Sequence, residues 1–421
     1  MPVMNKRRLL LLLPVLLAGG RSLATDFALR DGDTVVFLGD SITAARVYGK
    51  VIENYTLLRY PQRKVRFINA GHGGDTAEGG LKRLDRDVFA HGATVLTVAY
   101  GINDIGWGMK ADEEHKQRYL DAVRGIVEQC RQRNVRVLIC SPAITAEDPN
   151  RSENGFLQKM ADEGMALSKS LGGGAIDIQR GMREIQRRTW AANAREMDPK
   201  KKTTLHAEDG IHLNELGQLA MAYAILKGLG APAEVSSVTL DAREPNQVNA
   251  EGCRVTDVQW RDGSLTFTRL DEGLPLNLGI LGVLQFRFIP IPDQLNRYML
   301  TVRNLPAGRY EIRAEGRWVG TVTERQLHDG MNISSMTADP WEPGGPWDAQ
   351  AGVVKELTEA RDHLTVGNLL RNQFLSEHPQ REALGSQVTE TDERLISLQR
   401  DIARPFPYHF ELRSAPAEAK P

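Results

Sequence analysis

The sequence has few cysteines, almost no net charge and little that would cross a membrane. Its 421 residues include three cysteines, too few and too scattered for a disulfide framework or a thiolate metal site. The formal net charge is −1, so no broad electrostatic field favours nucleic acid or an anionic membrane. No clustered set of His, Cys and carboxylate residues predicts a metal site, and we expect no cofactor. Cys130 and Cys140 fall in apolar patterns and are expected to be core residues.

Residues 1–24 have the pattern of a cleaved export signal. Lys6-Arg7-Arg8 precedes an apolar run over residues 9–18, and the small-residue run Ser22-Leu23-Ala24 follows. A bilayer span needs about 20 apolar residues, so this run is short for a permanent membrane anchor, which is the alternative interpretation. We expect a soluble mature protein, exported to the periplasm or the extracellular space, without stable membrane insertion.

Short apolar runs alternate with helical patterns from residue 34 to about residue 230. The runs start roughly thirty to forty residues apart, which is the length of one strand plus a crossover helix. They are largely continuous in apolar residues, as expected of strands buried on both faces. The pattern predicts an α/β fold with a parallel sheet between helices and with functional residues at the carboxyl ends of the strands. The expected strands are 34–38, 65–68, 94–100, 135–140 and 175–178.

The pattern changes after residue 232. Short alternating runs separated by turn sequences predict a small antiparallel β domain, with 284–289 among its expected strands. Residues 339–347 are rich in Pro, Gly and Trp and are expected to form an irregular linker. Apolar residues at helical spacing then predict two amphipathic helices near the C-terminus. The predicted organisation is a signal at 1–24, the α/β domain at 25–232, the β domain at 233–338, and the linker with the C-terminal helices at 339–421.

The run Phe37-Leu38-Gly39-Asp40-Ser41-Ile42-Thr43 predicts a serine on a strand-to-helix turn. Gly39 lets the backbone bend tightly before Ser41, and the helix expected from Ile42 aims free N–H groups at developing negative charge. This placement suits a nucleophile, because a serine hydroxyl needs an adjacent base and oxyanion donors to react near pH 7. The alternative is that Ser41 only caps the helix, since Asp and Ser are both preferred there.

Three further blocks occupy positions that the predicted sheet would bring beside Ser41. Gly71 follows the second strand and has a backbone N–H that can approach a substrate oxygen; the alternative is a glycine-rich loop without function. Asn103 follows the third strand, where its amide can donate to an oxyanion or form an Asx turn. Asp209 and His212 precede a predicted helix and suit a general base held by a carboxylate, although helix starts often carry acidic residues.

The four blocks, in this order and at these strand ends, resemble those of the SGNH (GDSL) hydrolase family over roughly residues 33–228. The resemblance implies a flavodoxin-like α/β/α sandwich that hydrolyses carboxylic esters through an acyl-enzyme, without a metal or organic cofactor. It implies that Ser41 is the nucleophile, His212 the base and Asp209 the carboxylate that orients it. It also implies an oxyanion hole made of the backbone N–H groups of Ser41 and Gly71 and the side-chain amide of Asn103.

For the substrate, the sequence predicts a class of ester rather than a single compound. An exported hydrolase with an attached β domain fits removal of short acyl groups, chiefly acetyl, from carbohydrate such as an acylated polysaccharide. The family also contains lipases, thioesterases and arylesterases, so lipid or aryl esters are an alternative. A second alternative is a secreted glycan-binding protein on an inactive hydrolase scaffold, against which the intact Ser41, Asp209 and His212 weigh.

Three residues near the blocks receive weaker interpretations. His72 is interpreted as a solvated loop histidine rather than one that shapes the substrate site. Trp107 is either a platform for an acyl or sugar group or a side chain packed on its own loop. His206 follows a lysine-rich run, which indicates an exposed connection, and no role is assigned to it.

Overall fold

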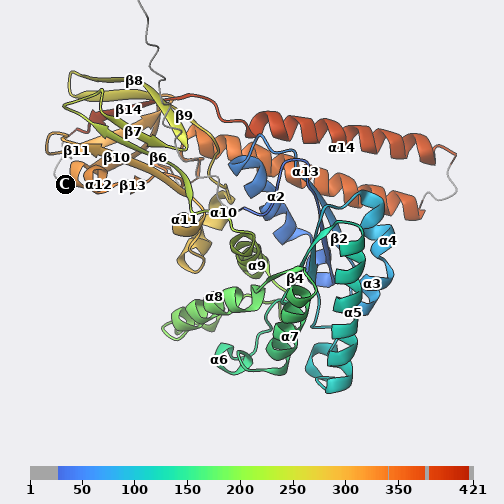
Figure 1. Ribbon diagram of the computed structural model, residues 1–421. Coiled ribbons are helices and arrows are strands. Elements are labelled where there is room, and N and C mark those ends of the chain that lie inside the picture. Colours follow the sequence, from blue (N-terminus) through green and yellow to red (C-terminus); the bar gives the residue numbers. More distant parts are fainter. Residues whose placement is uncertain (1–26, 340, 375–378, 417–421) are drawn as a thin grey trace, which may run out of the picture.

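The computed structural model describes residues 27–339, 341–374 and 379–416. They form an α/β half over residues 27–230 and a β half that follows it, with two long helices lying along the α/β half (Figure 1). The predicted signal at 1–24 lies outside the described residues. Of the helices within the described ranges, none has both the length and the apolar character that a bilayer span requires.

The α/β half is built on a five-stranded parallel sheet in the order β2-β1-β3-β4-β5. At its carboxyl edge Gly39 is paired with Gly71 on one side and Ala99 on the other, so the chain leaves three neighbouring strands at one place. The predicted fold class is confirmed. The strands are β1 (Thr34–Gly39), β2 (Arg66–Gly71), β3 (Val95–Ala99), β4 (Arg136–Cys140) and β5 (Gly174–Ile176).

Helices cover both faces of this sheet, which explains the continuous apolar runs. Val35 and Phe37 of β1 enter one core with α2, α8 and α9, while Val36 and Leu38 enter a second core with α3, α4, α5 and α7. Cys130 and Cys140 are buried, as predicted. The helices of this half are α1 (Ser41–Ala44), α2 (Val47–Arg59), α3 (Ala77–Lys82), α4 (Leu84–Asp87), α5 (Glu113–Gln132), α6 (Pro149–Ser152), α7 (Phe156–Ser170), α8 (Ile178–Asn193) and α9 (Glu215–Gly228), with short 3-10 turns at Phe89–His91, Gly106–Gly108 and Pro199–Lys201.

The β half contains two further sheets, one ordered β13-β10-β6-β7 and the other β12-β11-β14-β9-β8. The pairs are antiparallel except that β10 runs parallel to β6. Buried and partly exposed residues alternate along β9, β10 and β11, so one face of each strand enters the core. The strands are β6 (Glu234–Asp241), β7 (Val248–Glu251), β8 (Cys253–Arg261), β9 (Ser264–Asp271), β10 (Arg297–Arg303), β11 (Arg309–Ala314), β12 (Arg317–Thr323), β13 (Met331–Asn332) and β14 (Tyr408–Ser414).

Two expectations for this part of the chain were wrong. Residues 284–289, predicted as a strand, lie in and after the helical segment α10 (Gly279–Val283) and η4 (Leu284–Arg287). An isolated apolar run has no fixed periodicity of its own, so neighbouring structure decides its conformation. The C-terminal segment, predicted as linker and helices, also supplies β14 at the centre of the second sheet. Two short helices complete this half, α11 (Ile291–Gln294) and α12 (Glu324–Asp329).

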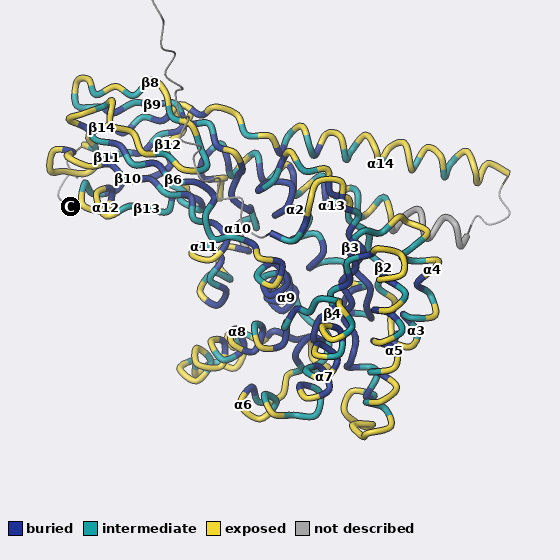
Figure 2. Tube along the Cα trace, viewed as in Figure 1, coloured by how far each residue is buried: buried dark blue, intermediate teal, exposed yellow. Residues whose placement is uncertain are grey.

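The predicted C-terminal helices are α13 (Pro346–Phe374) and α14 (Arg381–Ala403), which run side by side across α2 (Figure 1). Arg361 of α13 contacts Glu53 of α2 and Asp392 of α14, so one guanidinium links all three helices. Much of α14 is exposed on its outer side (Figure 2). The helical hairpin formed by α13 and α14 therefore packs on α2, the second helix after the Ser41 turn.

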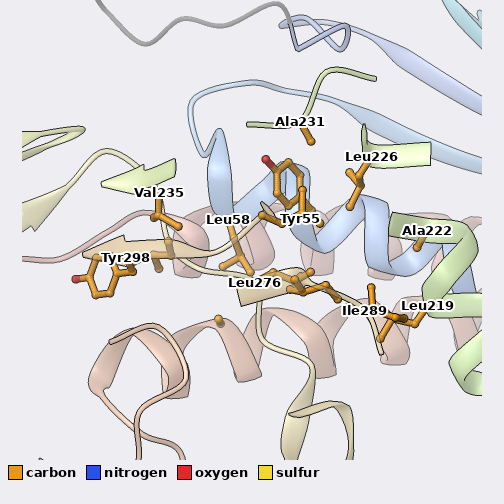
Figure 3. Packing of buried hydrophobic residues seen from close by; sticks show 14 of the residues in the cluster. Tyr55, Leu58, Leu219, Ala222, Leu226, Ala231, Val235, Leu276, Ile289 and Tyr298 are labelled. Atoms are coloured by element: carbon orange, nitrogen blue, oxygen red, sulfur yellow. The ribbon is translucent and has the colours of Figure 1, made fainter. Parts of the chain in front are cut away.

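The two halves share one hydrophobic core. Tyr55 and Leu58 of α2 and Leu226 of α9 pack near Val235 and Tyr298 of the β half (Figure 3). Polar contacts cross the same boundary: the Leu274 N–H donates to the Leu58 carbonyl over 2.8 Å. The boundary is thus buried, and the β half is a fixed neighbour of the α/β half.

Candidate active site

Ser41 is the first residue of α1, directly after β1. The preceding Asp40 is the N-cap, and its carboxylate accepts a hydrogen bond from the Ile42 N–H over 3.0 Å. Ser41 Oγ instead lies 2.9 Å from Nε2 of His212. The cap is therefore provided by Asp40, and the Ser41 hydroxyl faces a potential base. At the first helical position the Ser41 N–H also has no intrahelical acceptor.

His212 and Asp209 lie in the turn that leads into α9. Asp209 Oδ1 accepts from the backbone N–H groups of Ile211 and His212 over 2.9 Å each, and Oδ2 contacts His212 Nδ1. The hydrogen bond with His212 holds the pKa of Asp209 down at about 2. Gly210 permits the turn with a φ of 69°. The carboxylate is thus ionised at neutral pH and fixes the imidazole so that Nε2 faces Ser41.

Asn103 follows β3 and makes two hydrogen bonds that fix its amide. Its Nδ2 donates to the Asp75 carbonyl over 3.0 Å, and its Oδ1 accepts from Trp107 Nε1 over 2.8 Å. An amide nitrogen carries two hydrogens, so one N–H of Asn103 remains for a further acceptor. Asn103 therefore lies where the sequence predicted an oxyanion donor.

Gly71 does not have the free N–H that its predicted role requires. The Gly71 N–H donates to Asn69 Oδ1 over 3.0 Å, while Asn69 Nδ2 donates to the Thr43 carbonyl over 2.7 Å. A Cβ at residue 71 would lie 2.2 Å from the Ala44 nitrogen. Gly71 is thus needed for the close approach of β2 to α1 rather than for an oxyanion, a correction that the motif alone did not reveal.

The loop after Gly71 is held by charged side chains that the sequence analysis did not single out. Arg83 Nε donates to Asp75 Oδ2 over 2.8 Å, and Tyr100 Oη donates to the same oxygen over 2.8 Å. Arg83 also reaches the Gly39 carbonyl over 3.2 Å. This network joins the loop to the ends of β1 and β3, and so places Asp75 under the Asn103 amide. No sequence pattern marks a side chain that acts across 44 residues.

Trp107, His72 and His206, which received weaker interpretations from the sequence, lie in three different environments. Trp107 meets the His212 ring edge to face, with centroids 5.9 Å apart, so it belongs to the site. His72 is exposed, as interpreted. His206 was expected in an exposed connection but is buried, and its Nε2 lies 3.0 Å from the Ile144 carbonyl. Burial lowers the pKa of His206, so this imidazole is a neutral donor that ties two loops together.

The sequence pattern of the GDSL-like Lipase/Acylhydrolase family matches residues 37–220, a range that contains Ser41, Asn103, Asp209 and His212. Residues 37–220 are a GDSL-like hydrolase domain. The protein is therefore a carboxylic ester hydrolase. No curated protein matched the chain in a search by sequence.

Solved structures show how far the architecture around the GDSL domain is shared. A gut microbial diltiazem-metabolizing enzyme superposes with a TM-score of 0.79 at 22% identity, covering 93% of this chain and 100% of its own. An acetylxylan esterase from Geobacillus stearothermophilus has a TM-score of 0.39 at 18% identity, covering 48% of this chain and 96% of its own. An alpha/beta hydrolase enzyme from the metagenome of Lake Arreo, Spain, has a TM-score of 0.39 at 21% identity, with coverages of 48% and 98%. The first of these shows that the GDSL domain, β half and helices occur together in one known fold.

The GDSL domain thus brings a hydroxyl, an imidazole, a carboxylate and an amide donor to one sheet edge. His212 and Asp209 keep side-chain exposures of 38% and 37%, so the site is open to substrate and water. Within the described residues no group of three or more His, Cys, Asp or Glu has metal-binding geometry.

Proposed function

We propose that the protein removes short acyl groups, chiefly acetyl, from carbohydrate esters, with Ser41, His212 and Asp209 as its catalytic triad. The observation that carries the proposal is the 2.9 Å contact between Ser41 Oγ and His212 Nε2, with Asp209 on the other ring nitrogen. Hydroxyl, base and orienting carboxylate in this order form the arrangement that activates a serine for acyl transfer.

The reaction has two steps. Ser41 Oγ forms a bond to the ester carbonyl carbon while His212 Nε2 takes the hydroxyl proton, and the carbonyl electrons move to the oxygen. When this intermediate collapses, the bond to the alcohol breaks and His212 protonates the departing oxygen. A water molecule then gives a proton to His212 and forms a bond to the acyl carbon. When the bond between this carbon and Ser41 Oγ breaks, His212 returns the proton to Oγ and the acid is released.

The oxyanion is held by backbone and amide donors. We assign the Ser41 N–H and the free N–H of Asn103 Nδ2 to this role, and the Gly74 N–H in place of Gly71. Gly74 immediately precedes Asp75, whose carbonyl contacts the Asn103 amide. It lies in a turn with a φ of 73°, and its N–H has no hydrogen-bond acceptor within the described part of the chain. One such donor typically accounts for a factor of about 100 to 1,000 in rate.

The size of the cavity beside the triad supports a compact substrate group. A cavity of about 170 Å³ is lined by Trp107 and by residues of the segment after β4. Pockets that hold drug-sized ligands usually measure about 300 to 1,000 Å³, so this one suits a short acyl group or one sugar unit rather than a long chain. The export pattern at residues 1–24 supports an extracellular or periplasmic substrate.

Labelling by a fluorophosphonate probe tests the catalytic assignment. The purified protein is expected to be labelled at Ser41, and both Ser41→Ala and His212→Ala are expected to abolish turnover of p-nitrophenyl acetate while keeping the wild-type Tm. Ser170→Ala, an exposed serine on α7, is the matched control and should behave as wild type. A folded wild-type protein that is neither labelled nor active would favour the alternative of an inactive glycan-binding scaffold.

A substrate screen tests the acyl and alcohol parts. Acetylated oligosaccharides are compared with p-nitrophenyl esters from acetate to laurate and with aryl acetates. Highest kcat/KM on acetylated oligosaccharides supports the proposal, and a rise with chain length would replace it by a lipid esterase. N-terminal sequencing of the exported protein should begin after Ala24.

A further inference from the structure

One buried guanidinium in the α/β half has no carboxylate partner in the part of the chain that the structure describes. Arg183 of α8 is 2% exposed, and within the described residues it makes no ion pair. Its neighbours on the same helix differ: Arg180 pairs with Asp162 and Asp177, and Arg187 pairs with Glu153. Burying a cation without a counterion is costly, so a buried charge without a partner needs a reason.

Arg183 is held by neutral groups that leave part of its donor set unused. Nη1 donates to Gln158 Oε1 over 2.9 Å, while Nε and Nη2 reach Ser152 Oγ and the Ser152 carbonyl over 3.3 Å and 3.4 Å. A guanidinium has five N–H groups, so two remain without an acceptor here. The side chain is therefore oriented by neutral neighbours. Within the described residues no carboxylate lies at ion-pair distance from it, and Glu153 and Asp177 act on its charge only from further away.

Arg183 lines the cavity of about 170 Å³ that lies beside Trp107. Glu147, which is exposed, is the other charged residue among its described lining residues, and it makes no ion pair with Arg183. The remaining wall is largely apolar, with Ile102, Ile144 and Phe156. An apolar wall lowers the local dielectric and strengthens any charge interaction inside the cavity.

Two segments of the cavity wall adjoin the proposed catalytic residues. Ile102 is adjacent to Asn103, and Trp107 contacts both Asn103 and the His212 ring. Thr145 is adjacent to Ala146, whose N–H donates to the Gly210 carbonyl in the His212 turn over 2.8 Å. The cavity therefore adjoins the segments that hold Asn103 and His212.

We propose that Arg183 binds a carboxylate carried by the substrate, so that the preferred substrates are acetyl esters of acidic carbohydrate, with uronic acid units. The inference rests on the function proposed above. A carboxylate matches the planar donor fork of arginine and compensates the unpaired charge. Gln179 also lines the cavity and is 2% exposed, and its Oε1 is buried without a hydrogen-bond partner among the described residues. A sugar hydroxyl next to the carboxylate supplies the donor that this oxygen lacks.

The kinetic test compares matched acidic and neutral esters. Acetylated methyl glucuronoside is compared with acetylated methyl glucoside, and the mono-p-nitrophenyl ester of glutarate with p-nitrophenyl valerate. Wild-type protein is expected to prefer an acidic member in kcat/KM by about tenfold or more, the usual strength of a buried hydrogen bond to a charged group. The first pair places the carboxylate on the alcohol side, as proposed, and the second places it on the acyl side. A preference in the second pair alone would overturn the assignment to uronic acid units.

Substitutions at residue 183 test whether Arg183 causes the preference for acidic esters. Arg183→Gln should remove the preference, and Arg183→Lys, which keeps the charge but loses the fork, should retain part of it. Arg180→Gln, on the same helix, is the matched control and should keep the wild-type ratio. A merely structural role of Arg183 would lower activity on both members of a pair equally, and that result overturns the proposal.

Binding in the absence of turnover separates this inference from the proposed function. Calorimetry with Ser41→Ala protein and glucuronate is expected to show binding that glucose lacks and that weakens about tenfold or more when Arg183→Gln is added. Such binding supports the carboxylate site even if no ester is hydrolysed. A wild-type protein without acidic preference in either pair, together with no glucuronate binding, overturns it.

Discussion

Trp107 Nε1 donates a hydrogen bond of 2.8 Å to Asn103 Oδ1, while the same indole ring meets the His212 imidazole edge to face. Because Oδ1 is fixed by the indole, Nδ2 of Asn103 faces the other way, where it donates to the Asp75 carbonyl. Trp107 keeps this position in a left-handed conformation, with a φ of 58°, between Gly106 and Gly108, which also have positive φ. A bulky residue adopts that conformation only when its surroundings fix it.

Trp107→Phe is expected to lower kcat for p-nitrophenyl acetate about tenfold with little change in KM. The substitution keeps an aromatic ring but removes the donor, so the Asn103 amide loses its fixed orientation without being deleted. Complete loss of an oxyanion donor costs about 100-fold or more, which is the expected effect of Asn103→Ala. Trp190→Phe, an exposed tryptophan on α8, is the control. An unchanged kcat would show that the indole does not position Asn103.

Gly71→Ala is expected to destabilise the protein by about 2 kcal/mol or more, because the new Cβ would overlap the Ala44 backbone at the start of the site. Denaturant unfolding measures the change. Gly73→Ala is the matched control from the same loop, since a Cβ at residue 73 meets no heavy atom within 4 Å. Equal stabilities of the two variants would mean that β2 and α1 do not need their close approach.

Ser41 and Gly71 show which parts of the site could be predicted from the sequence and which could not. The five strands of the α/β half and the place of Ser41 could be predicted, because buried parallel strands and a strand-to-helix turn have local signatures. The structure brings Ser41, Asn103, Asp209 and His212 together at one sheet edge, as the strand order required. The hydrogen bond that occupies the Gly71 N–H depends on the rotamer of Asn69, which no local pattern encodes.

Contacts between residues far apart in the sequence were also not predicted. The sequence predicted helices near the C-terminus, but not that residues 408–414 form the strand β14 between β9 and β11. Likewise, Arg183 follows the helical pattern of α8 like its neighbours Arg180 and Arg187. Only the fold shows that two of these arginines have carboxylate partners and that Arg183 has none among the described residues.

Arg361→Ala is expected to lower the free energy of unfolding by about 3 kcal/mol, because it leaves the Glu53 carboxylate buried without its cation. Burial already raises the pKa of Glu53. Chemical denaturation measures the loss. Arg394→Ala breaks an exposed pair with Glu390 on α14 and should cost well under about 1 kcal/mol. Similar losses in the two variants would show that the hairpin contributes little to the fold.

Asp104→Asn is expected to change how stability depends on pH. Burial raises the pKa of Asp104 to about 7, with Asp40 and Asp75 adding to the effect, and Oδ2 has no hydrogen-bond partner within the described ranges. Between about pH 4 and about pH 7 the folded protein keeps a proton that the unfolded chain releases, so this contribution to stability is lost as the pH rises. The Asn side chain does not titrate. The variant should therefore gain at least about 1 kcal/mol relative to wild type across this range, measured by denaturation at several pH values. Parallel stability curves would contradict the assignment.

The position of β14 has a consequence for how the chain is made. This strand is the central one of its sheet, yet it follows both long helices in the sequence, so the ribosome delivers it after every strand that it joins. Until then β9 and β11 each present an unpaired edge, the kind of surface on which nascent chains aggregate. The α/β half, whose last helix α9 ends at Gly228, is synthesised first and can form its parallel sheet during synthesis, whereas the β half must wait for the strand that closes it.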